Sequence, residues 1–187
     1  YVTAWAKWRT GDQAGAWQAI VAAVKGWNNS PGRDSVDRDV LLFAGRTNVS
    51  MTDAVAALSP IYGKAADQMY ELYAKLGLQA YQYAGRWADG VAALEKALST
   101  IGTKVPPNDL PVIKFQQGDY TARIDDPATA AKYALDALKA LPACGTKCSN
   151  QDKENVVGSV YIMGRLFHIL YATAHAARSY QPADRPR

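Results

Sequence analysis

The chain has 187 residues, of which 49% are hydrophobic and 20% charged, so it can bury a substantial core, which excludes global disorder. Its net charge is +4, but the lysines and arginines are scattered rather than clustered, which disfavours a nucleic-acid-binding surface. No run approaches the roughly 20 apolar residues of a transmembrane helix, so we expect no membrane-spanning segment.

Helical spacing of apolar residues recurs along the whole chain, whereas alternating runs of β-branched residues do not occur. This pattern predicts helices over residues 2–9, 13–27, 34–45, 51–59, 62–84, 88–101, 110–123, 127–141 and 151–177. Glycine and proline mark the breaks, as at Gly11, Gly85 and Pro142. Asp109 and Asp126 stand where an N-cap side chain would begin a helix. The sequence therefore predicts an all-α protein.

Small residues recur at matching places in four of these predicted helices. They are Ala16, Ala23, Ala54, Gly90, Ala97, Ala130 and Ala137. A large apolar residue accompanies them at Ile20, Leu58 and Leu94. Because small side chains let two helices approach closely, we expect these positions to lie at helix–helix interfaces.

This pattern resembles the tetratricopeptide (TPR) repeat, a helix-turn-helix unit. In the clearest copy, YQYAGRWADGVAALEKAL, the matching residues are Tyr81, Gly85, Trp87, Gly90, Leu94 and Ala97. One equivalent small position recurs at residues 16, 54, 90, 130 and 183, with spacings of 38, 36, 40 and 53, all longer than the 34 residues of the family. The alternative is a non-repeating helical bundle with alanine-rich interfaces.

The resemblance implies a right-handed solenoid of stacked antiparallel helix pairs, with a concave groove lined by the first helix of each pair. Carried over position by position, the family's groove selects Trp5, Trp8, Arg9, Leu72, Lys75, Gln79, Gln82, Tyr83, Arg165, His168, Ala172 and His175. This mixed aromatic, polar and basic set suits an extended peptide or a chain end that carries a carboxylate. Core packing is the alternative role for the tryptophans.

The resemblance therefore predicts a non-catalytic scaffold that binds a partner protein or peptide through the nine groove residues other than Arg9, Leu72 and Ala172. The alternative is an all-α small-ligand domain or enzyme that uses Arg165, His168 and His175. The two histidines are seven residues apart, about 10 Å along a helix, which is too far for one metal ion. No nucleophile or phosphate-loop motif occurs, so we expect no catalytic residue, metal or cofactor.

Cys144 and Cys148, in PACGTKCSN, are the two cysteines of the chain. Two thiols cannot complete a structural zinc site, and their spacing is not the C-x-x-C of redox enzymes. The spacing suits a local disulfide between Cys144 and Cys148, which we expect, and which favours the periplasm or the cell exterior and a cell-envelope assembly. Free thiols in the cytoplasm are the alternative.

The chain begins without methionine and stops at YQPADRPR, where the repeat pattern expects another second helix. We therefore expect residues 1–187 to form a single domain that is a piece of a longer protein. An apolar helix face left open in the last repeat would favour a homodimer.

Overall fold

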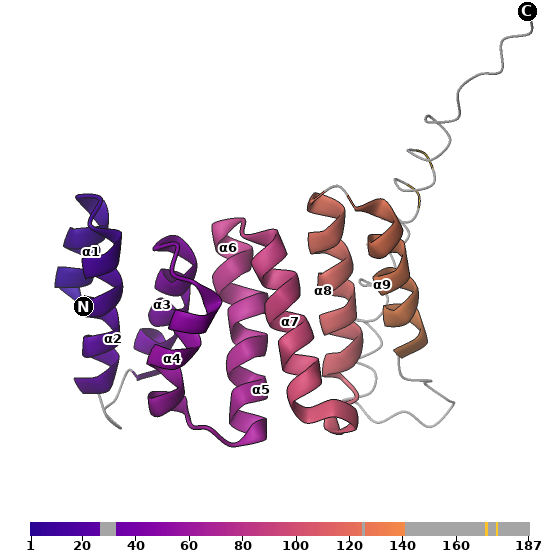
Figure 1. Ribbon diagram of the computed structural model, residues 1–187, viewed down its shortest axis with the longest axis horizontal. Coiled ribbons are helices and arrows are strands. Elements are labelled where there is room, and N and C mark those ends of the chain that lie inside the picture. Colours follow the sequence, from indigo (N-terminus) through magenta and orange to yellow (C-terminus); the bar gives the residue numbers. More distant parts are fainter. Residues whose placement is uncertain (27–32, 125, 141–170, 172–174, 176–187) are drawn as a thin grey trace, which may run out of the picture. The chain divides into compact units, whose positions relative to one another are not determined.

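The computed structural model describes residues 1–26, 33–124, 126–140, 171 and 175 (Figure 1). Within these residues all regular structure is helical and no strand occurs, which confirms the predicted all-α class. The chain divides into two compact units, residues 1–104 and residues 105–187. The single domain over the whole chain stays a prediction.

The first unit is a series of helices that lie side by side (Figure 1). They are α1 (Val2–Arg9), α2 (Gln13–Gly26), α3 (Arg33–Arg46), α4 (Met51–Tyr62), α5 (Ala66–Lys75), the π-helical stretch η1 (Leu76–Tyr81), α6 (Gln82–Ala84), α7 (Trp87–Ile101) and the 3₁₀ turn η2 (Gly102–Lys104). α1 packs on α2, α2 on α3, α3 on η1, and both α5 and η1 on α7.

Helix α4 departs from its predicted end at residue 59. It runs on through Pro60 to Tyr62, because the missing proline N–H removes one hydrogen bond near the exposed end of the helix and leaves the preceding turns intact. The next helix consequently begins at Ala66, after the predicted start at residue 62.

The small residues predicted at interfaces are buried in the first unit. Ala16, Ala54 and Ala97 have no exposed surface, and Gly90 is buried as well. The large apolar residues Ile20, Leu58 and Leu94 are also fully buried. Ala23 is the exception, since it is half-exposed on α2. The alanine-rich helices thus pack through the predicted faces.

Two glycines of the first unit lie where helices approach too closely for a side chain. A Cβ on Gly45 of α3 would overlap the carbonyl oxygen of Ala80 in η1. A Cβ on Gly77 of η1 would come within 2.7 Å of Leu94 in α7. The π-helical stretch is therefore held on both sides by glycine contacts, one with α3 and one with α7.

The turn into α7 joins three parts of the first unit. Gly85 has a left-handed φ of +70°, which a glycine adopts readily. Arg86 then donates hydrogen bonds from Nη1 to the carbonyls of Ala44 and Val49, and its Nε lies 2.7 Å from Asp89. This guanidinium ties the start of α7 to the end of α3 and the loop that follows it.

The second unit contains α8 (Asp109–Arg123) and α9 (Pro127–Ala140), which pack on one another. Their shared core holds Phe115 from α8 and three alanines of α9, Ala130, Ala134 and Ala137. The burial of Ala130 and Ala137 was predicted from the repeat pattern.

Of the two predicted N-caps, one is confirmed and one is wrong. Asp126 accepts a hydrogen bond from the Thr129 N–H at 3.1 Å and so caps α9. Asp109 is instead the first residue within α8, and Asn108 before it makes no side-chain cap. The reason is that α8 begins one residue earlier than its pattern predicts.

Candidate functional site

Side chains at the start of the chain contact α3, among them Tyr1, which precedes α1, and the predicted groove residue Trp5. The Tyr1 hydroxyl donates to the Asp39 carboxylate, which raises the tyrosine pKa above its usual value. The Trp5 ring packs edge-on against Phe43 at 4.9 Å between centroids. The partners in both pairs are 38 residues apart.

Arg46, the last residue of α3, extends the row of contacts formed by the pairs Tyr1–Asp39 and Trp5–Phe43. Its Cζ lies 5.3 Å from the Trp5 ring centroid and 5.5 Å from that of Trp8, and residues 8 and 46 are again 38 apart. The two indole rings are perpendicular, with centroids 5.7 Å apart. The Arg46 guanidinium therefore lies at the surface against the rings of Trp5 and Trp8, which attract its positive charge.

Apart from its contacts with the two indole rings, Arg46 has no charged partner within the described part of the chain. Its side chain is exposed, and no carboxylate of the described residues pairs with it, whereas Lys7, Lys75 and Arg123 each pair with an acidic side chain. A guanidinium in this position has N–H donors available for a planar anion such as a carboxylate.

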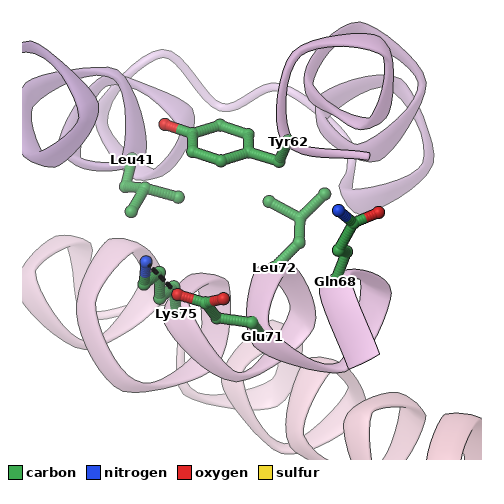
Figure 2. Close-up of a pocket in the computed structure, with 6 residues that line it drawn as sticks. All are labelled: Leu41, Tyr62, Gln68, Glu71, Leu72 and Lys75. Atoms are coloured by element: carbon green, nitrogen blue, oxygen red, sulfur yellow. Dashed lines mark ion pairs between the residues drawn. The ribbon is translucent and has the colours of Figure 1, made fainter. Parts of the chain in front are cut away.

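A second candidate site is a pocket between α3, α4 and α5, shown in Figure 2. It is lined by Leu41, Tyr62, Gln68, Glu71, Leu72 and Lys75. The apolar side chains and the tyrosine ring form the walls, and Glu71 and Lys75 form an ion pair on one side of it. Lys75, a predicted groove residue, therefore belongs to a site of mixed polarity.

The other predicted residues near Lys75 do not line this pocket. Gln79 is half-exposed, and Gln82 and Tyr83 are exposed, with 74% of the tyrosine surface accessible. A π-helical turn contains more residues than an α-helical one. The π-helical stretch η1 follows Lys75 directly, and its Ala80 lies against Gly45 of α3.

The remaining predicted site residues belong to the second unit. Arg165 and His168 lie outside the described residues, as do Cys144 and Cys148. His175 is exposed, and its ring lies 6.0 Å from that of Tyr171. The histidine face and the disulfide stay predictions.

Sequence reasoning missed Arg46, although a signal for it exists. The first repeat contributes Trp5 and Trp8 at fixed distances before Ala16, and the same distances before Ala54 select Phe43 and Arg46. The prediction skipped this second copy. Tyr62 offered no comparable signal, because its place in the pocket depends on how α4 meets α5.

The described residues contain no group of three or more His, Cys, Asp or Glu side chains that could hold a metal ion. Among the helices of residues 1–140 that are described, none is long and apolar enough to cross a membrane. Comparison with protein-family models, with curated proteins and with solved structures finds no match to this chain.

Proposed function

We propose that the chain is a non-catalytic protein-interaction module, built from TPR-like stacked helix pairs, that binds an extended peptide of a partner protein across α1 and α3. The observation that carries this proposal is the surface guanidinium of Arg46, held by Trp5 and Trp8 and available to an acidic group.

The repeat architecture is supported by the contacts between α1 and α3. Three side-chain pairs join residues that are 38 apart, and Ala16 and Ala54, which are both fully buried, have the same spacing. Equal spacing in four places is expected if α1 with α2 and α3 with α4 are successive copies of one unit.

The binding role is supported by the chemistry of the exposed row. Tryptophan and arginine are the residue types enriched at the energetic centres of protein interfaces. Contact with the indole rings keeps the Arg46 fork oriented, so less side-chain freedom is lost when it binds a carboxylate. Tyr1 and Arg46 at the two ends of the row are exposed and both tryptophans are half-exposed, which suits an extended segment.

Peptide selection tests this proposal. Peptides selected from a random-sequence library against the intact chain should be enriched in acidic residues, and isothermal titration gives their dissociation constants. Arg46→Gln should weaken binding about tenfold or more, because it removes a hydrogen-bonded ion pair. Arg38→Gln, at an exposed arginine on the same helix, is the matched control.

Unchanged circular dichroism would show that Arg46→Gln leaves the fold intact. Failure to select any binding peptide, or equal affinities for the wild type and Arg46→Gln, would refute the proposal. The alternative role as an enzyme or small-ligand domain stays a prediction, since Arg165 and His168 are not described.

A further inference from the structure

The row of contacts between the start of the chain and α3 carries opposite charges at its two ends. Arg46 stands at one end, and the carboxylate of Asp39 stands at the other, seven residues earlier on the same helix. We propose that the row binds a peptide segment in the polyproline II conformation that carries an acidic and a basic residue three positions apart. The acidic residue pairs with Arg46 and the basic residue with Asp39. Since the contact with Arg46 is that of the proposed function, the inference rests on it and adds the second charge and the spacing.

The two charges lie on the same side of α3. Asp39, Phe43 and Arg46 are four and three residues apart, the spacings at which side chains on a helix are neighbours. All three contact side chains at the start of the chain, which confirms that they share one side. Because an α-helix rises about 1.5 Å per residue, the two charged residues are about 10 Å apart along its axis.

The carboxylate of Asp39 is available to a basic group. The Tyr1 hydroxyl donates one hydrogen bond to it, whereas the two oxygens of a carboxylate offer about four acceptor sites. Asp39 is half-exposed, and no lysine or arginine of the described residues forms an ion pair with it. Asp39 therefore offers a cation what Arg46 offers an anion, a charge that no opposite charge among the described residues neutralises.

The distance between the charges selects the conformation of the ligand. A polyproline II helix rises about 3.1 Å per residue with about three residues per turn, so residues i and i+3 share one side and are about 9 Å apart. In a β-strand, the residues on one side are two or four positions apart, at about 7 or 13 Å. The polyproline II spacing matches the row, and segments of this conformation bind surfaces lined by aromatic rings, here those of Trp5 and Trp8.

Proline-rich peptides with one acid and one base test the inference, because proline favours the polyproline II conformation. The probes are acetylated peptide amides that contain Glu-Pro-Pro-Lys or Lys-Pro-Pro-Glu, one order for each chain direction. In a matched peptide, norleucine replaces lysine, which removes the charge and keeps the apolar stem. In isothermal titration against the intact chain, lysine should strengthen binding about two- to tenfold over norleucine in the tighter-binding order, as expected for a partly exposed ion pair.

Variants of the chain locate the basic residue of the peptide. Asp39→Asn should abolish the advantage of lysine over norleucine, while the amide oxygen still accepts a hydrogen bond from Tyr1. Asp67→Asn, at an exposed aspartate on α5, removes the same charge away from the row and should retain the advantage. Peptides with Glu-Pro-Lys or Lys-Pro-Glu place the charges one residue closer and should show no advantage that depends on Asp39.

Three results would overturn the inference. The lysine and norleucine peptides could bind equally in both orders, or fail to bind, which would remove the basic residue. The advantage of lysine could survive in Asp39→Asn, which would place the cation elsewhere. The shorter peptides could show the same Asp39-dependent advantage, which would remove the spacing. The proposed function is tested separately, because acidic peptides from the library should lose affinity in Arg46→Gln whether or not they carry a lysine.

Discussion

The two units join their helices by different means. In the first unit, the Gly45 backbone meets the Ala80 backbone directly, and the Arg86 guanidinium links α7 to two carbonyls outside it. In the second unit, α8 meets a stripe of alanines on α9, and a Cβ added to Gly118 would lie 3.3 Å or more from its neighbours. A Cβ on Gly45 would overlap a backbone oxygen, which leaves no room for a methyl group, so this interface tolerates far less change than the one at Gly118.

Among the substitutions that compare the two units, a change at Arg86 should lower the free energy of unfolding the most. Arg86→Ala leaves the Ala44 and Val49 carbonyls without this donor and removes the pair with Asp89, so we expect a loss of about 2–4 kcal/mol in the free energy of unfolding. Urea unfolding followed by tryptophan fluorescence measures it, because all five tryptophans lie within residues 1–104.

The matched change in the second unit is Arg123→Ala. Arg123 is exposed and pairs with Asp119 at 3.0 Å within α8, whereas Arg86 donates to carbonyls outside its own helix, so we expect the removal of Arg123 to cost about 0–1 kcal/mol. Losses of equal size at Arg86 and Arg123 would contradict the role assigned to Arg86.

The second-largest difference in stability between the units should come from Gly45 and Gly118. Gly45→Ala should destabilise the chain by about 1–3 kcal/mol through overpacking, despite the better helix propensity of alanine. Gly118→Ala should destabilise the chain less than Gly45→Ala does, because its Cβ would meet the Ala130 carbonyl oxygen at 3.3 Å, which requires a shift of only a few tenths of an ångström, and its other neighbours at 3.5 Å. Urea unfolding followed by far-UV circular dichroism compares them, and equal destabilisation would show that the two interfaces are equally tight.

The smallest effect on stability should come from Asp12 and Asp126, the two aspartates that cap helices. Hydrogen bonds from Thr129 lower the pKa of Asp126, whereas Lys7 first and the Gly15 N–H second lower the pKa of Asp12. Each folded-state pKa lies below its unfolded value, so each contribution is complete above about pH 4 and is lost as the pH falls through the folded-state value.

Salt distinguishes the two caps. Asp12→Asn should lower the thermal midpoint less in about 1 M salt than at low salt, because screening weakens the pair with Lys7. The effect of Asp126→Asn should change little with salt, since Thr129 is neutral. Equal salt dependence in thermal melts at neutral pH would indicate that Lys7 does not stabilise the first cap.

Much of the fold could be predicted because its signals are local. Apolar spacing fixed the helices to within a few residues, and the repeat pattern selected Ala16, Ala54 and Ala130, which are fully buried. The site was predicted less completely. Trp5, Trp8 and Lys75 lie in the two candidate sites, but their partners Arg46 and Tyr62 come from other helices.

The sequence by itself determined an all-α chain, the helix faces that are buried, and the left-handed turn at Gly85, since each follows from residues within a few positions of one another. Only the tertiary structure decided the π-helical stretch, the place of the Arg86 guanidinium and the pocket beside Tyr62. These features depend on contacts between residues far apart in the chain, as between Arg86 and Ala44, and no local pattern records how closely two helices approach.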